Sequence, residues 1–269
     1  MGQQVLKVKI KQPNAHYRVP FSYQRRFTYP IPPYSTVKGL ICNLLGIIDE
    51  LDEKFKKIKE LSLAIYGKYE SMVKEYVWFR NLELKSHISK FGTSKNRFVD
   101  RVPQHPGGQI PVTVDVLQDV NLIIYIYHPD ESFLKEIKNA FENPTNRLST
   151  IHLGRAEDWI VIKEVKFLQL SKKTVFNLKY FAWIPEPQYL DENFYIESYK
   201  SFFDNLNGNL FRLPTFYEIT VDNQRIFNEY VTVKLYEGGN FKRFELYVDN
   251  DENLPVILSK LRGNKDARA

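Results

Sequence analysis

The chain has 269 residues, of which 43% are hydrophobic and 26% charged, and its formal net charge is +6. This is the balance of a soluble globular protein with a real core, in one large domain or two small ones. No run reaches the length of a membrane span, and the N-terminus lacks a signal-peptide pattern. A single cysteine, Cys42, excludes an internal disulfide, so we expect a cytoplasmic protein.

The first predicted element is a strand over residues 5–11, in which hydrophobic and basic residues alternate. One face carries Leu6, Val8 and Ile10, and the other carries Lys7, Lys9 and Lys11. We therefore expect a half-buried strand with a basic outer face.

A helix with a proline-rich entry follows. Pro30, Pro32 and Pro33 hold the approach extended, because proline fixes its own φ and biases the preceding residue away from the α region. Ser35 or Thr36 is a suitable N-cap, and apolar residues recur at helical spacing between 40 and 45. The free N–H groups and the positive dipole end of this helix lie near Lys38, and such an end suits an anion, most commonly phosphate.

Positive charge is concentrated in two segments. Residues 1–48 contain no Asp or Glu and carry a charge of +7, and residues 80–101 carry +4, so the rest of the chain is acidic overall. Segregated positive charge is typical of a site for a nucleic-acid backbone, and the alternative is a solvated surface that aids solubility. The chain is also rich in Tyr and Phe, which offer surfaces for base stacking where they adjoin basic residues.

The next pattern predicts a helical stretch over 51–66 and a long strand over 73–88. A basic excursion over about 85–111 ends in proline- and glycine-rich sequence and predicts a projecting hairpin. The remaining elements of this half are strands at 112–116 and 120–127, an amphipathic helix at 131–142 and a strand region at 159–170.

This order of elements predicts an α+β fold of the ferredoxin-like βαββαβ type over residues 1–170. The aromatic signature of RNA-recognition modules with this fold is missing, so a base-stacking sheet is not supported. Residues 171–261 read as a mostly β appendage with strands at 215–221, 230–236 and 241–248, and we expect residues 262–269 to be a disordered tail.

None of the five histidines pairs with Cys, Asp or Glu at metal-ligand spacing, and nucleotide-binding and hydrolase motifs are missing, so we predict no metal and no cofactor. His16 with Tyr17 and Arg18 could supply an acid and a base for RNA cleavage, as could Tyr23 with Lys38 and His87. A histidine in a basic strand more often contacts backbone or phosphate.

Residues 152–159 form a compact motif around Gly154 and Arg155. Glycine permits an unusual backbone conformation, and arginine binds carboxylate or phosphate through two parallel hydrogen bonds. Glu157 and Asp158 are local partners for this arginine. An internal clamp that closes a loop is therefore the alternative to a phosphate contact.

Three segments together resemble the fifth Cas family, the RAMP-type subunits of the CRISPR Cascade complex. Tyr29-Pro-x-Pro-Pro-x-Ser-Thr-x-x-Gly-Leu40, followed by Leu44-Leu-Gly46, resembles the entry to the first helix of that family. Leu153-Gly-Arg-Ala-Glu-Asp158 resembles a second motif, especially of the subtype I-B branch, and Asn209-Leu-Phe-Arg-Leu-Pro-Thr-Phe-Tyr217 resembles its C-terminal part.

The resemblance implies a ferredoxin-like RAMP domain with a thumb-like insertion, here about 85–111. It also implies a protein of antiviral defence that holds the 5′ handle of the CRISPR RNA and caps the backbone filament. The implied partners are the backbone subunit and the large subunit, with target DNA met indirectly and no membrane. In the I-C branch the corresponding subunit cuts precursor RNA with Tyr, Lys and His, whereas I-B systems resemble those with a separate nuclease.

We therefore predict a non-catalytic RNA-binding subunit. The alternatives are a metal-independent endoribonuclease that processes precursor CRISPR RNA and a protein-only adaptor. The residues predicted to contact RNA are Arg25, Arg26, Tyr34, Ser35, Thr36, Lys38, Lys85, His87, Lys90, Lys95, Arg97, Arg101 and Arg155.

Overall fold

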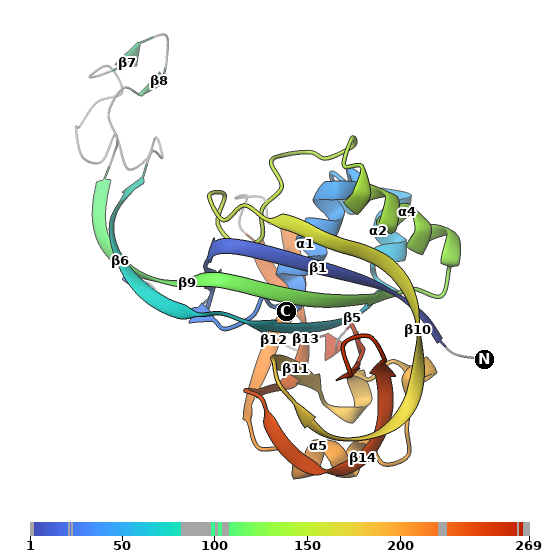
Figure 1. Cartoon of the computed structure of the whole chain (residues 1–269). Coiled ribbons are helices and arrows are strands. Elements are labelled where there is room, and N and C mark those ends of the chain that lie inside the picture. The colour runs from blue at the N-terminus through green and yellow to red at the C-terminus, as the bar shows by residue number, and fades with distance from the viewer. Residues whose placement is uncertain are drawn as a thin grey trace.

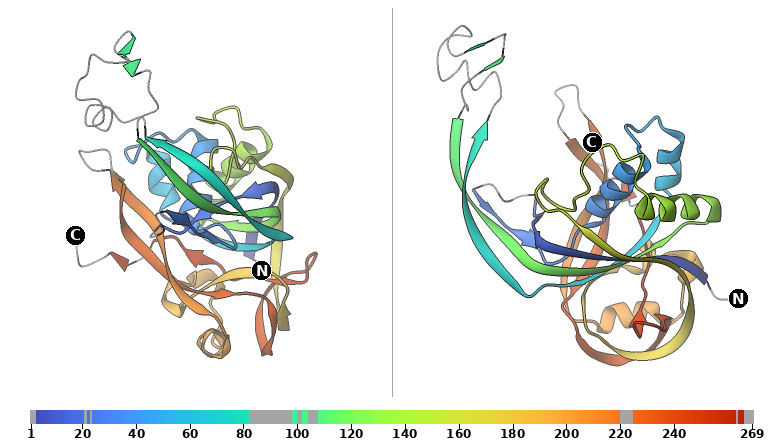
Figure 2. Two further views of the ribbon diagram at one scale, coloured as in Figure 1. Left: turned by 90° about the vertical axis from the view of Figure 1, so that its left-hand side faces the viewer. Right: turned by 45° about the horizontal axis from the view of Figure 1, so that its top comes forward.

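Hydrophobic side chains on both faces of the central strands build two layers around a large antiparallel sheet. The computed structural model describes residues 3–20, 22, 24–81, 98–99, 102–103, 108–219, 225–262 and 264–265. Within these residues the strands follow the order β12-β13-β11-β5-β9-β1-β10-β14-β15 (Figures 1 and 2). The fold is thus a mixed α/β arrangement dominated by one sheet.

Four strands form the centre of this sheet, and each pairs with its neighbour in the antiparallel sense. In spatial order they are β5 (Ser62–Lys68), β9 (Gly108–Tyr127), β1 (Gln3–Ala15) and β10 (Val161–Leu178). The alternation in β1 places Leu6, Val8 and Ile10 in one hydrophobic cluster and Val5 in another. The predicted strand over 5–11 is confirmed, and it is buried on both faces.

Three helices cover one side of the central strands, and the C-terminal elements cover the other (Figure 1). The helices are α1 (Tyr34–Leu45), α2 (Glu53–Ile58) and α4 (Glu131–Glu142). Helix α4 agrees with the predicted range, and the Asp130 carboxylate caps it by accepting hydrogen bonds from the N–H groups of Ser132 and Phe133.

The predicted helical stretch over 51–66 is wrong beyond Ile58. Helix α2 ends there, and residues 62–68 form strand β5 instead. The spacing misleads because β5 is buried on both faces: Leu63 and Ile65 face the helices, while Ala64 and Tyr66 face the C-terminal layer. A continuous apolar run of this kind fits both the helical period and the strand period, and it forms a strand here because both of its faces are buried in the sheet.

The two strands predicted at 112–116 and 120–127 form one strand, β9. Asp119, at the junction, adopts a positive φ of 54° without ending the strand. Residues 108–118 of β9 pair with β6 (Ser71–Asn81), so that Gln118 lies opposite Ser71 and Gly108 lies opposite Asn81. Strand β6 and this part of β9 form a long curved ribbon, the β6–β9 ribbon, that extends away from the body (Figure 2).

Most of the predicted excursion over 85–111 lies outside the described residues. Its last residues, 108–111, belong to β9 and therefore continue the regular ribbon. Short strands β7 (Phe98–Val99) and β8 (Val102–Pro103) pair with each other. Two further short pairings involve β2 (Tyr17–Arg18) with β4 (Thr28–Tyr29) and β3 (Arg25–Arg26) with β9.

The C-terminal half continues the central sheet. Strand β10 crosses the predicted boundary at residue 170, pairing first with β1 and then with β14. The predicted strands at 215–221, 230–236 and 241–248 correspond to β12, β13 and β14, with residues 220 and 221 outside the described part. The bounds are β11 (Phe181–Pro185), η1 (Pro187–Tyr189), η2 (Glu192–Phe194), α5 (Tyr199–Asn205), β12 (Asn209–Ile219), β13 (Arg225–Tyr236), β14 (Gly239–Asp249), β15 (Leu254–Pro255), β16 (Ser259–Lys260) and β17 (Asn264–Lys265).

The predicted tail over 262–269 is described only in part. Asn264 and Lys265 form β17, whose backbone pairs with Tyr230 and Glu229 of β13. Residues 263 and 266–269 lie outside the described residues. In the part of the chain that the structure covers, no helix is both long and apolar enough to cross a membrane.

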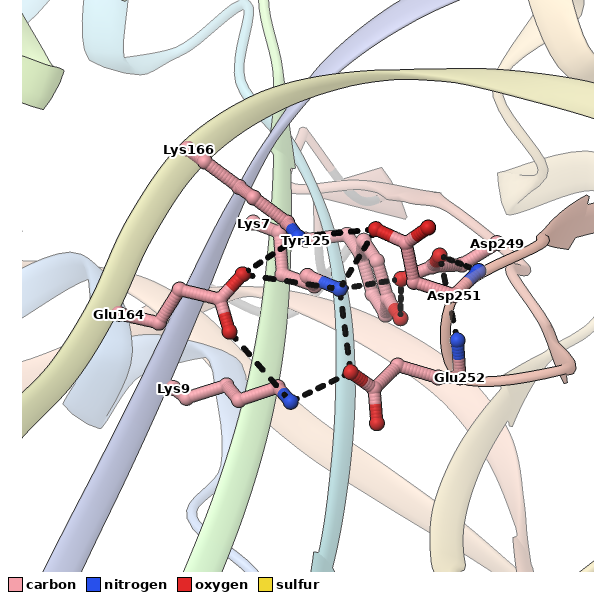
Figure 3. A network of polar contacts seen from close by, with 8 residues as sticks. All are labelled: Lys7, Lys9, Tyr125, Glu164, Lys166, Asp249, Asp251 and Glu252. Atoms are coloured by element: carbon pink, nitrogen blue, oxygen red, sulfur yellow. Dashed lines mark hydrogen bonds and ion pairs between the residues drawn. The ribbon is translucent and has the colours of Figure 1, made fainter.

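The basic outer face expected for β1 is wrong, because acidic side chains pair with its lysines. Lys7 has no exposed side-chain surface, and its Nζ lies 2.8 Å from Asp249 Oδ2 and 3.2 Å from Glu252 Oε1 (Figure 3). Lys9 pairs with Glu252 and with Glu164, from which it lies 3.4 Å.

This charge network, made of Lys7, Lys9, Glu164, Lys166, Asp249, Asp251 and Glu252, joins three strands. Lys166 on β10 contacts Glu164 and Asp251, each at 2.8 Å, and the Tyr125 hydroxyl on β9 donates to Asp249 at 2.8 Å (Figure 3). A buried lysine retains its charge only where carboxylates surround it. The network therefore fixes the turn after β14 against the central sheet.

Candidate nucleic-acid-binding cleft

Helix α1 begins at Tyr34, so its N-cap lies two residues before Ser35 and three before Thr36. Pro33 is the N-cap residue, with extended backbone (φ −70°, ψ 160°), and no side chain caps this end. The N-cap prediction for Ser35 or Thr36 is therefore wrong, and both residues lie in the first helical turn, partly exposed. Their hydroxyls and the positive end of the helix dipole border the same open space.

The loop that carries Gly154 and Arg155 is closed by an internal clamp. The Asp158 carboxylate, which has no exposed surface, accepts hydrogen bonds from Arg155 Nη2 at 2.8 Å and Nε at 3.1 Å. Arg155 Nη1 donates to Glu75 of β6 at 3.0 Å, and Nε lies 3.4 Å from Glu157. The clamp predicted as the alternative reading of this motif is thus present.

Gly154 is required by the geometry of this clamp. Its φ is +115°, a conformation that side chains rarely adopt. A Cβ at this position would lie 2.8 Å from Asp158 Oδ2 and 2.9 Å from the His16 carbonyl oxygen. The glycine therefore lets the loop approach the end of β1 closely.

The end of β1 holds the loop through buried hydrogen bonds. The His16 backbone N–H donates to Asp158 Oδ2 at 2.9 Å. The Gln12 amide donates to the carbonyl oxygens of Leu153 and Asp158 at 2.9 and 3.1 Å, and the Tyr17 hydroxyl donates to Gln12 at 2.6 Å. Burial raises the pKa of Tyr17 well above its ordinary value, so its proton stays in this hydrogen bond.

These elements enclose a cleft of about 420 Å³, the arginine cleft. Its lining brings together four of the predicted contact residues from three separate segments, namely Arg26, Ser35, Thr36 and Arg155. Arg18 lines it as well. Converging guanidinium groups at a helix N-terminus attract anions.

Apolar surfaces form the rest of the arginine cleft. The Arg26 guanidinium lies 3.6 Å from the centre of the Phe79 ring, so the two planar groups contact each other. Phe79 is 43% exposed on β6, and Phe227 lines the cleft from β13. A site with cationic groups beside accessible rings suits a nucleotide strand, whose phosphates are anionic and whose bases stack.

A second and larger depression, the helix groove, runs along α1 with a volume of about 910 Å³. It shares Ser35, Thr36, Gly154 and Phe227 with the arginine cleft, so the two depressions adjoin at the first turn of α1. Gly39 and Asn43 lie along its helical wall.

Two predicted contact residues lie in the core. The Tyr34 side chain has no exposed surface. Lys38 is 4% exposed. Its Nζ lies 4.2 Å from the ring centre of Phe216 and 5.3 Å from that of Tyr217, so this side chain of α1 packs against β12. Lys38 borders the helix groove, but its ammonium group is surrounded by aromatic rings rather than by water.

Arg25 is exposed beside the cleft, 5.1 Å above the Phe27 ring. The other six predicted contact residues, Lys85, His87, Lys90, Lys95, Arg97 and Arg101, lie outside the described residues. Sequence analysis missed Phe79 and Phe227 as cleft residues, because aromatic residues in strands usually belong to a core. It considered Arg18 only as part of a catalytic group.

His16 is the histidine of the arginine cleft and is 4% exposed. Its Nδ1 lies 2.7 Å from the Asp115 carbonyl oxygen. Burial lowers the pKa of His16, and the positive charges of Arg155 and Arg26 lower it further. The ring is therefore neutral at pH 7.

Comparison with known proteins gives a consistent result. The model of a family described as "CRISPR-associated protein (Cas_Cas5)" matches residues 5–226. A chain of a solved structure described as "CRISPR RNA-guided surveillance complex" is 12% identical with a TM-score of 0.50, over 90% of this chain and 91% of that chain. A CRISPR protein from Archaeoglobus fulgidus is 11% identical with a TM-score of 0.45, over 96% of this chain and 100% of that chain.

No curated protein sequence matches this chain significantly. The likeness to the surveillance-complex chain supports the fold, and the family model covers most of the sequence, including the first helix entry and the loop at 153–158. The predicted family is thereby confirmed, whereas its I-B branch stays a prediction. The chain belongs to the Cas5 family of CRISPR-associated proteins.

Proposed function

We propose that this protein is a non-catalytic subunit of a type I CRISPR surveillance complex that binds the 5′ handle of the guide RNA in the arginine cleft. The main observation in support is the convergence of Arg18, Arg26 and Arg155 at the first turn of α1, beside two accessible aromatic rings. Family membership and the similarity to a chain of a CRISPR RNA-guided surveillance complex agree with this role.

The connectivity of the central strands supports a ferredoxin-like core. Along the chain, the main elements of this core come in the order β1, α1, β5, β9, α4 and β10, and β6 is inserted between β5 and β9. In the sheet, the four core strands lie side by side in the order β5-β9-β1-β10. That arrangement supports our proposal of a βαββαβ core. In this proposal the β6–β9 ribbon is the base of the thumb, which contacts the backbone subunit, and a further surface meets the large subunit.

A salt titration tests the binding site. Arg18→Ala/Arg26→Ala removes two cleft charges, and the matched control Lys163→Ala/Lys173→Ala removes two exposed charges from β10, outside both depressions. Binding of single-stranded handle RNA is measured by fluorescence anisotropy at several salt concentrations. The cleft variant should reduce the slope of log K against log salt by about 1.4, or about 0.7 for each lost phosphate contact.

The control variant should keep the wild-type slope. An unchanged slope in the cleft variant, or an equal reduction in the control, would show that the RNA lies elsewhere.

A second function, endoribonuclease activity, is favoured by one observation, the neutral imidazole of His16 in the cleft. A neutral histidine can act as a general base toward a 2′-hydroxyl. Incubation of the protein with repeat RNA in EDTA distinguishes the two functions. Specific cleavage that His16→Ala or His87→Ala abolishes would replace the non-catalytic proposal.

A further inference from the structure

The His16 ring presents one nitrogen that has no partner in the described structure. Nδ1 contacts the Asp115 carbonyl oxygen, which only accepts hydrogen bonds, so Nδ1 carries the proton. Nε2 is then an acceptor, and it is buried with no hydrogen-bond partner among the described residues. A buried acceptor without a donor costs free energy that a bound donor would recover.

The surroundings of His16 define which ligand can supply that donor. Asp115 occupies the Nδ1 side of the ring, and His16 lines the arginine cleft, so we take this cleft as the side from which a donor approaches the buried Nε2. The cleft is also lined by Arg18 and Arg26 and by Ser35 and Thr36 at the start of α1, whereas the charge of Arg155 is already balanced by Asp158 and Glu75. A matching ligand is therefore anionic and carries a hydroxyl group near its anion.

A ribonucleotide strand has this combination, because each ribose places a 2′-hydroxyl next to a phosphate. We propose that His16 Nε2 accepts a hydrogen bond from a ribose 2′-hydroxyl, so that the arginine cleft selects RNA over DNA. This inference rests on the proposed function, and it identifies one residue and one atom of the ligand as the basis of the selection.

The neighbours of His16 favour this binding role over cleavage. Cleavage at the same hydroxyl would also need an acid that protonates the leaving oxygen. The adjacent Tyr17 hydroxyl is buried and committed to Gln12, and an arginine does not release its proton. The hydroxyl therefore donates to His16 and keeps its proton, so that no bond forms from its oxygen to phosphorus.

Substitutions that separate the two ring nitrogens test the inference. His16→Asn keeps a donor near the position of Nδ1 and removes the acceptor at Nε2, whereas His16→Gln keeps an acceptor near Nε2. Anisotropy is measured with an RNA oligonucleotide and with DNA of the same sequence. We expect His16→Asn to lower the RNA-to-DNA affinity ratio about five-fold, the value of one hydrogen bond, with DNA affinity unchanged.

His16→Gln should restore part of the ratio. The control is His128→Asn, which alters a histidine that lines neither depression and whose Nε2 contacts the Lys57 carbonyl oxygen, and it should leave the ratio unchanged. A ratio that His16→Asn does not change, or site-specific cleavage of the RNA, would overturn the inference. No binding of either strand by the wild-type protein would instead overturn the proposed function.

Modified RNA gives a second test that needs no protein variant. Single 2′-fluoro substitutions remove the hydroxyl donor while keeping an electronegative group at the same carbon. One position of the oligonucleotide should lose about five-fold in affinity for the wild-type protein, and a 2′-amino group, which donates, should recover it. Equal affinity for every singly substituted RNA would contradict a 2′-hydroxyl contact.

Discussion

Single residues at the loop over 153–158 determine whether the arginine cleft forms. Gly154 provides a positive φ, Asp158 collects donors from two segments, and Arg155 spans from the loop to Glu75 of β6. Because Asp158 also accepts from the His16 N–H, the clamp places His16 in the cleft wall. The loop is therefore a structural support for the site as much as a contact surface.

Gly154→Ala should destabilise the protein. The new Cβ would meet Asp158 and the His16 carbonyl, and the left-handed backbone would be strained, at a cost of about 1–3 kcal/mol. The measurement is urea unfolding followed by tryptophan fluorescence. Gly39→Ala on α1 is the control, because its Cβ would meet nothing within 4 Å and alanine favours a helix by up to about 1 kcal/mol. Equal stability of the two variants would contradict the account.

Arg155→Lys should impair both stability and RNA retention. Lysine cannot reproduce the two parallel hydrogen bonds from Nε to Asp158 Oδ2 and from Nη2 to Asp158 Oδ1, and we expect a loss of about 1–2 kcal/mol. Unfolding and RNA anisotropy are measured on the same preparation. If Arg155→Lys has wild-type stability and wild-type RNA affinity, the two parallel hydrogen bonds to Asp158 have no role.

Elements of the fold are joined by buried charges as well as by apolar packing. The charge network fastens the turn after β14 to β1 and β10, and its centre, Lys7, is inaccessible to water. Lys7→Met leaves the Asp249 carboxylate buried without its lysine and should cost about 3 kcal/mol. Lys11→Met, whose partner Asp119 is about half exposed, should cost less than about 1 kcal/mol.

Chemical denaturation of both variants gives the comparison. A Lys7→Met protein as stable as Lys11→Met would mean that the network contributes little to the attachment of the C-terminal strands.

The same network predicts that stability falls in acid. Hydrogen bonding to Lys166 lowers the pKa of Glu164. Burial opposes ionisation of Glu252, but hydrogen bonds from Lys9 and Lys7 outweigh it and lower its pKa too. A carboxyl group whose pKa is lower in the folded state than in the unfolded state stabilises the folded state. This stabilisation is complete above the unfolded-state pKa, near 4.5, and is lost as the pH falls through the folded-state pKa. The urea midpoint should therefore drop between pH 5 and pH 3, by less in Lys7→Met than in the wild type.

The β6–β9 ribbon extends away from the body (Figure 1). Removing residues 89–101 should leave the central sheet folded, because the described ladder up to Asn81 and Gly108 is retained. We expect the shortened protein to fail to enter the surveillance complex or to displace the junction of handle and spacer. Copurification with the other subunits and mapping of the protected RNA measure this, and normal assembly would exclude a thumb role.

For the whole molecule, the sequence predicted the elements with clear periodicity. The alternation in β1 and the helical spacing in α4 were sufficient, because each pattern admits one period. Strand β5 was missed since it is buried on both faces, and its burial depends on the C-terminal layer. The charge network was missed for the same reason: Lys7 and Asp249 are distant in sequence, and no local pattern pairs them.

The candidate site was predicted in part. Local motifs indicated the α1 entry and the loop with Arg155, and the fold places both in one cleft with Arg26. The burial of Lys38 depends on β12, whose Phe216 ring lies against the lysine ammonium group, and the motif at the α1 entry does not describe that strand. The arrangement of these parts is thus a property of the assembled sheet.

The central claim is that guide RNA lies in the arginine cleft. Ultraviolet crosslinking of the purified protein–RNA complex, followed by mass spectrometry, tests it most directly. We predict crosslinked peptides that contain Phe79 and Phe227, joined to nucleotides of the 5′ handle. Crosslinks confined to the opposite layer, around α5 and β14, would contradict the account.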